Sequence, residues 1–198
     1  MNNWTTIKSI AENSGGYLVT KQVEDAGISR TVLKQYVDSG DLIRVCKGRY
    51  ILSESITDEY ALLQSRNSNA VFSHGTALFL WGMSDRVPHV IDMTVPQGTN
   101  VSKIKRDNPD VRFHYIRREL HSLGISKTQT PQGLTVSLYD RERCICDLIL
   151  ARKQTDMQLY SQALKGYFSD DPNLRRLLKY GEKLGLVDKI RTYMEVLS

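Results

Sequence analysis

The order of helix and turn signals in the first 52 residues admits few folds. Apolar residues recur there at helical spacing, and two short β-branched runs flank a glycine turn, which is typical of a hairpin. Thr20 and Ser29 are placed to cap helices, and Gly27 suits the tight turn between them. The predicted elements are helices over residues 4–13, 21–26 and 30–38 and hairpin strands over residues 41–46 and 49–52. Helix, short helix, tight turn, helix and hairpin form the layout of a winged helix-turn-helix.

A second pattern follows, in which helical spacing gives way to β-branched runs and then returns. The predicted helices cover residues 58–66, 71–82, 140–153, 155–168, 172–184 and 186–197, and the predicted strands cover residues 89–96, 111–116 and 134–138. The expected fold class is therefore α+β. We expect an N-terminal winged helix-turn-helix domain over residues 1–56. A larger mixed α+β domain over residues 57–198 would have a central antiparallel or mixed sheet and C-terminal helices.

Charge and hydropathy narrow the choice of partner and compartment. The net charge of +5 favours a polyanionic partner. Residues 1–56 hold seven Lys or Arg against six Asp or Glu, so DNA binding there would rely on a few well-placed cations. The sequence has no apolar run of about 18 residues, as a membrane helix requires, and no secretory leader. We expect a cytoplasmic protein that does not bind a membrane.

One face of the helix predicted after Ser29 suits the major groove of DNA. Apolar residues at positions 32, 33, 36 and 37 would anchor it, while polar side chains project from its first half. Arg30 matches the edge of guanine, Gln35 matches adenine, and the helix start suits a phosphate. Cations of the hairpin suit a phosphate or a narrow minor groove. The candidate DNA-binding residues are Ser29, Arg30, Thr31, Lys34, Gln35, Arg44, Lys47 and Arg49.

The densest positive segment lies in the second domain, over residues 103–118. Its cations would neutralise further phosphates and extend a DNA footprint. The alternative is a solvated loop and strand edge, where Lys and Arg block edge-to-edge pairing of sheets. The candidate accessory DNA-binding residues are Lys103, Lys105, Arg106, Arg112, Arg117 and Arg118.

Catalysis finds little support in the sequence. Asp92 lies in a predicted strand as a nuclease carboxylate would, but no Asp or Glu is followed two positions later by the Lys that such a site needs. His74 fits a capping or core histidine, and residues 140–143 fit the acidic first turn of a helix. Cys144 and Cys146 fit small core residues. We expect no catalytic site, no metal and no cofactor, and a metal-dependent nuclease is the less favoured alternative.

Several short motifs, in a fixed order over nearly the whole chain, carry a family resemblance. They are Gly16-Tyr17-Leu18-Val19-Thr20 through Lys47-Gly48-Arg49-Tyr50, Phe72-Ser73-His74-Gly75-Thr76-Ala77-Leu78, Val90 to Gly98 with its Val95-Pro96-Gln97-Gly98 end, and Tyr139-Asp140-Arg141-Glu142-Arg143-Cys144-Ile145-Cys146-Asp147. In these the sequence resembles the AbiEi-type antitoxins of bacterial type IV toxin–antitoxin systems, which act in abortive infection, a form of phage defence.

The resemblance implies an antitoxin that is also a transcriptional autorepressor. Its partner would be double-stranded DNA, in the form of inverted repeats in the promoter of its own operon. It would counteract a nucleotidyltransferase-type toxin encoded by a neighbouring gene, and a stable complex with that toxin is not implied. A protein-interaction module that neutralises a partner without binding DNA is the alternative.

Overall fold

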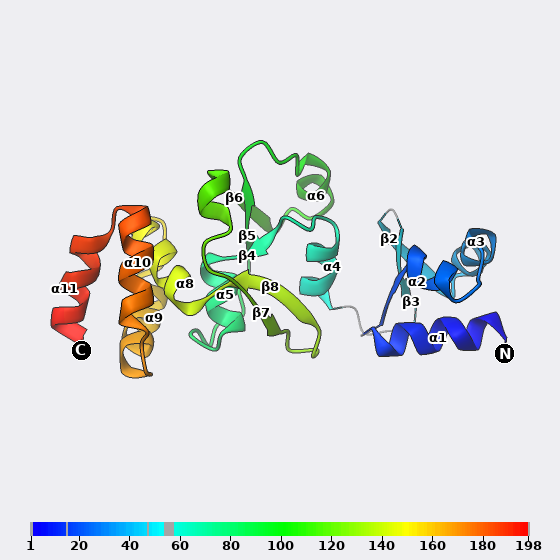
Figure 1. The fold of residues 1–198 in the computed structure, drawn as a ribbon, viewed down its shortest axis with the longest axis horizontal. Coiled ribbons are helices and arrows are strands. Elements are labelled where there is room, and N and C mark those ends of the chain that lie inside the picture. Colours follow the sequence, from blue (N-terminus) through cyan, green and yellow to red (C-terminus); the bar gives the residue numbers. More distant parts are fainter. Residues whose placement is uncertain (1, 15, 47, 54–57, 198) are drawn as a thin grey trace. The chain divides into compact units, whose positions relative to one another are not determined.

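The computed structural model describes residues 2–14, 16–46, 48–53 and 58–197. The chain divides into two compact units (Figure 1). The first unit comprises Met1–Asn67 and Thr130–Leu134, and the second comprises Ser68–Gln129 and Thr135–Ser198. The boundary predicted between residues 56 and 57 lies outside the described residues and stays a prediction.

The first unit is a winged helix-turn-helix with one further helix. Its elements are α1 (Asn3–Asn13), β1 (Tyr17–Val19), α2 (Thr20–Asp25), α3 (Arg30–Asp38), β2 (Leu42–Cys46), β3 (Arg49–Leu52) and α4 (Glu59–Ser65). The predicted helices and hairpin are confirmed. The structure adds β1, which pairs antiparallel with β3, so the sheet has the order β1-β3-β2. Three residues are too few to display the alternation by which a strand is predicted.

The core of this winged helix brings α1, α2, α3 and the sheet together around fully buried aliphatic side chains. They include Ile7, Leu18, Val23, Leu33 and Leu42. One predicted detail is wrong: the N-cap of α2 is Val19, and Thr20 is already helical. The Val19 amide donates to Oε1 of Gln22 at 3.0 Å, which is the contact that the N3 residue makes in a capping box. The other contact of a capping box is missing, because valine has no side-chain oxygen to accept from a helix amide.

A buried carboxylate fixes α4 and residues 130–134 within the first unit. Asp58 caps α4 by accepting from the amide of Ala61 at 3.1 Å, and it also accepts from the hydroxyl of Thr130. The hydroxyl of Tyr17 donates to the Asp58 carbonyl at 3.0 Å. Burial, with the nearby Asp58 charge, raises the pKa of Tyr17 to about 12. This hydroxyl is therefore a permanent donor at physiological pH.

The second unit is built on a five-stranded mixed sheet of order β6-β5-β4-β8-β7. Its elements are β4 (Val71–Phe72), α5 (His74–Leu80), β5 (Ile91–Pro96), α6 (Ser102–Asp107), β6 (Val111–Ile116), α7 (Arg118–His121), β7 (Ile125–Gln129), β8 (Thr135–Tyr139), α8 (Arg141–Leu150), α9 (Met157–Ser169), α10 (Leu174–Leu184) and α11 (Val187–Leu197). Strands β5 and β6 are parallel, as are β4 and β8, while β4 and β5 and also β7 and β8 are antiparallel. The predicted α+β class with a mixed sheet and C-terminal helices is confirmed.

The helix predicted over residues 71–82, with Ser73 as its cap, begins after Ser73, and the two residues assigned to it before that cap form a strand. Val71 and Phe72 form the short central strand β4, and the chain turns at His74, whose φ of 48° lies in the left-handed region. Ser73 is the N-cap of α5, but its hydroxyl makes no capping hydrogen bond. A strand buried on both faces carries a continuous apolar run, so periodicity alone does not separate it from the helix that follows.

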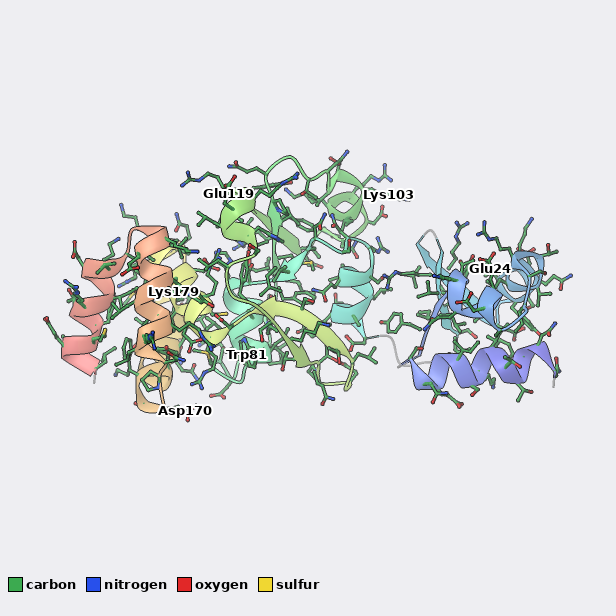
Figure 2. The ribbon with its side chains drawn as sticks, viewed as in Figure 1. Glu24, Trp81, Lys103, Glu119, Asp170 and Lys179 are labelled. Carbon is green, nitrogen blue, oxygen red and sulfur yellow. The ribbon has the colours of Figure 1, made fainter. Side chains whose placement is uncertain are left out.

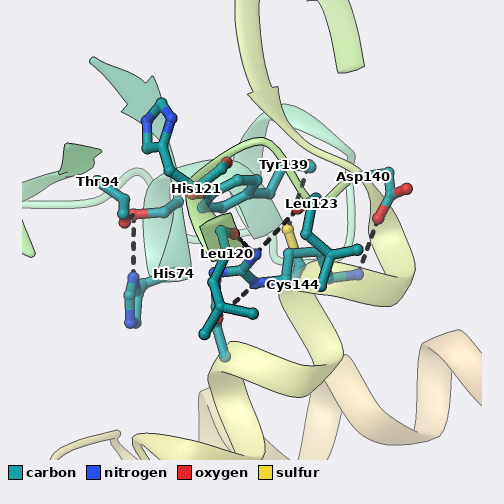
Figure 3. A network of polar contacts seen from close by, with 11 residues as sticks. His74, Thr94, Leu120, His121, Leu123, Tyr139, Asp140 and Cys144 are labelled. Atoms are coloured by element: carbon teal, nitrogen blue, oxygen red, sulfur yellow. Dashed lines mark hydrogen bonds and ion pairs between the residues drawn. The ribbon is translucent and has the colours of Figure 1, made fainter. Parts of the chain in front are cut away.

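A buried guanidinium organises the second unit around α8 (Figure 3). The side chain of Arg143 is 1% exposed, and its Nε donates to Oδ1 of Asp147 at 2.9 Å. Its Nη1 donates to the carbonyls of Leu120 and Leu123, both at 2.9 Å. The guanidinium also lies 4.1 Å from the ring centroid of Tyr139. One side chain therefore joins α8, the segment around α7 and the end of β8.

The first turn of α8 also anchors the C-terminal helices. Asp140 is the N-cap, and its Oδ2 accepts from the hydroxyl of Tyr180 on α10 at 2.8 Å. The buried carboxylate of Glu142 accepts from Tyr167 of α9 at 3.3 Å and from Arg176 of α10 at 3.4 Å. The acidic first turn predicted here is confirmed, and its carboxylates are used for packing as well as for the helix dipole.

The two cysteines of α8 are core residues, as predicted. Cys144 and Cys146 are both fully buried. Burial raises the pKa of Cys146 to about 12 and holds that of Cys144 well above its usual value. Because the thiolate is the reactive form, both side chains are inert in the folded protein.

Replacing Arg143 by Met is expected to destabilise the second unit by about 3–5 kcal/mol, because Asp147 would be left buried without its cation. The measurement is urea unfolding followed by the fluorescence of Trp81, in a Trp4→Phe background that silences the first unit. Trp81 reports on this core because its indole donates to the Tyr139 carbonyl at 2.8 Å.

The matched control is Arg141→Met, on the same helix. Arg141 pairs with Asp170 at 2.9 Å, but the Asp170 side chain is 78% exposed, so the loss is expected to stay below about 1 kcal/mol. Adding Asp147→Leu to Arg143→Met removes both buried charges and should recover part of the stability. Equal losses for the two arginine variants would contradict the role given to Arg143.

Candidate nucleic-acid interface

The turn between α2 and α3 places the start of α3 at the surface. Gly27 takes a φ of 79°, and Ile28 then enters the core. Ser29 is the N-cap of α3, and its hydroxyl accepts from the amide of Val32 at 3.5 Å. The Ser29 hydroxyl is therefore used within the helix, while the first amides of α3 lie at an exposed end. Such an end attracts phosphate.

Helix α3 separates its two faces as the periodicity predicts. Leu33 is fully buried, and the ring of Tyr36 packs on that of Trp4 with centroids 4.8 Å apart. The polar side chains of the outer face are all exposed; they are Arg30, Thr31, Lys34 and Gln35. A buried anchor with an exposed polar face is the arrangement that lets a helix enter the major groove.

The structure adds a contact on this face that the sequence did not indicate. Nε of Arg30 lies 2.5 Å from Oε1 of Glu24 on α2, with side chains that are 76% and 38% exposed. Glu24 is labelled in Figure 2. The pair joins the two helices of the helix-turn-helix and neutralises the first cation of the outer face. To contact DNA, the guanidinium of Arg30 would have to release the Glu24 carboxylate or contact the carboxylate and the DNA together.

The hairpin cations lie on both strands of the wing. Arg44 of β2 is exposed and stands opposite Tyr50, while Arg49 of β3 is half-buried. Gly48 takes a φ of 78°, and its carbonyl accepts from the amide of Thr20 at 2.9 Å. Lys47, the remaining candidate, lies outside the described residues.

The basic segment of the second unit is exposed at every predicted position. Lys103, Lys105 and Arg106 lie on α6, Arg112 lies on the edge strand β6, and Arg117 and Arg118 lie at the start of α7. Lys103 extends from α6 into solvent in Figure 2. Three members make contacts of their own. Nη1 of Arg112 is 3.9 Å from Asp92, Nε of Arg106 is 3.5 Å from Asp107, and the ammonium of Lys105 is 5.8 Å from the ring centroid of Tyr115.

Sequence reasoning missed a polar cluster beside this segment. The imidazoles of His74 and His114 stack with centroids 3.8 Å apart, and Nε2 of His114 lies 2.7 Å from Oδ1 of Asp92. The hydroxyl of Thr94 donates to Ser73 at 2.8 Å, and Ser73 contacts Nδ1 of His74 at 3.0 Å. The signal that would have revealed the cluster is the parallel register of β5 and β6, which sets Thr94 beside His114.

The predicted core role of His74 holds only in part, because its ring belongs to this cluster. Burial lowers the pKa of His74, since the desolvation outweighs the nearby carboxylates of Asp147 and Asp92. The ring is therefore neutral at physiological pH. Within the described ranges, no three His, Cys, Asp or Glu side chains gather closely enough to hold a metal ion.

Residues 6–53 match the sequence profile of a family described as "Transcriptional regulator, AbiEi antitoxin". This match confirms the predicted resemblance over the winged helix. No curated protein matches the sequence. Among solved structures, the RV2827C protein from Mycobacterium tuberculosis is similar, with a TM-score of 0.63 and 14% identity. The similarity covers 98% of this chain and 82% of that one, and it supports the fold.

Among the helices that the structure describes, each is too short or too polar to cross a lipid bilayer.

The lowered pKa of His74 predicts a pH-dependent stability of the second unit. In the folded state the pKa lies below the usual value of about 6.5, so the unfolded chain binds more protons just below that pH. The contribution is therefore complete above about pH 6.5 and is lost as the pH falls toward the lowered pKa. The buried His121, whose pKa burial also lowers, acts in the same direction.

Urea unfolding monitored through Trp81 between about pH 7.5 and 5.5 tests this. The His74→Asn variant should show a shallower loss, because Asn does not titrate and tolerates a positive φ. Asp140, whose pKa burial raises from 3.8, changes stability in the opposite sense as the pH falls, so the test is the difference between variant and wild type. Identical pH dependence in both proteins would contradict the assignment.

Proposed function

We propose that this chain, whose N-terminal domain is that of an AbiEi antitoxin transcriptional regulator, represses its own operon by binding inverted repeats in the promoter. Helix α3 enters the major groove of one half-site, and the wing bearing Arg44 and Arg49 lies on the flanking backbone. Two copies on an inverted repeat cover the promoter and exclude the polymerase. We propose no enzymatic role for the chain.

The observation that carries the proposal is the exposed outer face of α3 on a winged helix of this family. Arg30 and Gln35 offer the groups that read guanine and adenine, and Lys34 offers a cation for a base or phosphate. The remaining contacts go to the phosphates, including the candidate accessory contacts of the basic segment over residues 103–118.

The antitoxin activity is proposed to act against a nucleotidyltransferase-type toxin encoded by a neighbouring gene. Coexpression of the two genes should restore growth that the toxin alone stops. Affinity capture of the tagged antitoxin should then recover little toxin, because a stable complex is not required. Recovery of an equimolar complex from the same cells would favour the alternative, a module that neutralises its partner by direct binding.

Replacing Arg30 or Gln35 by Ala is expected to weaken binding to the promoter repeat by about 1–3 kcal/mol and to relax its sequence preference. The measurement is fluorescence anisotropy on duplexes that carry the repeat or a scrambled repeat, at several salt concentrations. Arg44→Ala or Arg49→Ala should weaken binding to both duplexes alike and make the salt dependence shallower.

Arg191→Ala is the matched control for the arginine variants, since Arg191 is exposed on α11 and is not proposed to contact DNA. It should bind as wild type does. A double variant, Arg30→Ala with Lys34→Ala, that keeps full affinity for the repeat would refute the role of α3. Absence of any salt-dependent, specific binding by the wild type would favour the protein-interaction alternative.

Glu24→Gln is expected to strengthen DNA binding several-fold. It removes a carboxylate from the face that approaches phosphates and releases Arg30 from its 2.5 Å contact. Asp25→Asn is the matched control: Asp25 is the exposed neighbour on α2, and the charge change is the same. If both variants gain equally, the gain comes from net charge, and the proposed competition for Arg30 is wrong.

A further inference from the structure

The second unit contains a cavity that DNA binding does not use. Its volume is about 430 Å³, which is within the range of small-molecule sites. The lining comes from the polar cluster around His74 and His114, from the end of β6, and from α8 and the residues that follow it. The proposed repression leaves it without a role.

At this cavity one strong hydrogen-bond acceptor lacks a donor. Asp147 lines the cavity and its side chain is 5% exposed. Its Oδ1 accepts from Nε of Arg143 at 2.9 Å, whereas its Oδ2 is buried and has no hydrogen-bond partner among the residues that the structure describes. Buried carboxylate oxygens are normally satisfied, so an exception at a cavity points to a donor that a ligand supplies.

The cavity combines this polar group with apolar walls. Ile116 and Ala151 contribute aliphatic surface. Tyr115 and Leu150 also line it, and 47% and 52% of their surfaces are exposed. The ammonium of Lys105 lies 5.8 Å from the Tyr115 ring centroid, so a ring that stacks on Tyr115 shares it with this cation. Aromatic and aliphatic faces with one placed acceptor suit a flat ring that carries N–H groups.

The charges around the cavity favour a neutral ring over a cation. Arg143 already balances Asp147, and the burial of His74 keeps that ring uncharged. A ligand ammonium or guanidinium would therefore meet the guanidinium of Arg143 with no unbalanced carboxylate to offset it. A neutral N–H supplies the missing donor without adding charge.

We infer that this cavity binds a nucleobase, whose ring contacts Tyr115 and Leu150 and whose N–H donates to Oδ2 of Asp147. The base comes either from a free nucleoside or nucleotide or from an unpaired nucleotide of a nucleic acid strand. The inference does not depend on operator recognition by α3, because every lining residue lies in the second unit.

Isothermal titration calorimetry on the full-length protein tests the inference. The probes are adenosine, guanosine, cytidine and uridine, a single-stranded DNA hexamer of mixed sequence, and agmatine as a cationic probe. Purine riboside serves as the matched ligand control, since its base has the shape of adenine but no N–H group. At least one nucleoside should bind with a Kd below about 1 mM, and purine riboside should bind at least about tenfold more weakly than adenosine if adenosine is that ligand.

The variant that tests the location is Leu150→Glu, which puts a charge on the exposed wall without touching the Arg143–Asp147 pair. It should weaken nucleoside binding at least about tenfold. Met157→Glu is its control, because Met157 is similarly exposed, at 55%, and does not line the cavity. Circular dichroism should show both variants folded.

Each outcome decides the matter. Binding of a nucleoside that Leu150→Glu reduces and Met157→Glu preserves supports the inference for a free ligand. Binding of the hexamer alone, with the same response to the variants, supports it for a base within a strand. Binding of agmatine without any nucleoside, equal binding by Leu150→Glu, or no binding of any probe at millimolar concentration overturns it.

Discussion

The second unit depends on the burial of one positive charge. The guanidinium of Arg143 is removed from water, so its hydrogen-bond donors must be met by fixed partners. The carbonyls of Leu120 and Leu123 and the carboxylate of Asp147 meet them, and the ring of Tyr139 covers one face. Because the two carbonyls and the Tyr139 ring lie outside α8, the charge holds α8 in one position relative to the sheet. Helices α9 and α10 contact the first turn of this same helix, through Glu142 and Asp140.

In the winged helix, the feature that matters is the distribution of surface charge. It carries almost no net charge, yet its proposed partner is a polyanion. The structure concentrates exposed polar groups on the outer face of α3 and holds Arg30 against Glu24. A surface neutralised in this way attracts DNA of arbitrary sequence weakly, so a larger share of the affinity must come from contacts to base edges. Such a balance favours selectivity over tight binding.

Local patterns were enough to predict much of this molecule. The spacing of Leu33 and its apolar neighbours predicted the buried and outer faces of α3, and the glycine turn predicted the hairpin of the wing. Elements with little local signal were missed: β1 is three residues long, and β7 alternates exposed and half-buried residues that are polar apart from Ile125. The cluster of His74 and His114 depends on strand register, and the burial of Arg143 depends on long-range contacts. Neither is encoded in spacing along the chain. The candidate DNA contacts could be named from the sequence, but the Arg30–Glu24 pair required the fold.

The two inert thiols of α8 have a practical consequence. A reagent such as iodoacetamide reaches Cys144 or Cys146 only when the helix separates from its neighbours, so their alkylation rate in native buffer measures how often that happens. The hydrogen bonds from Arg143 to the carbonyls of Leu120 and Leu123 must break in the same event, whereas its pair with Asp147 lies within α8. Peptide mass spectrometry would distinguish these two sites from Cys46. The core therefore contains two natural probes for the frequency of its local opening.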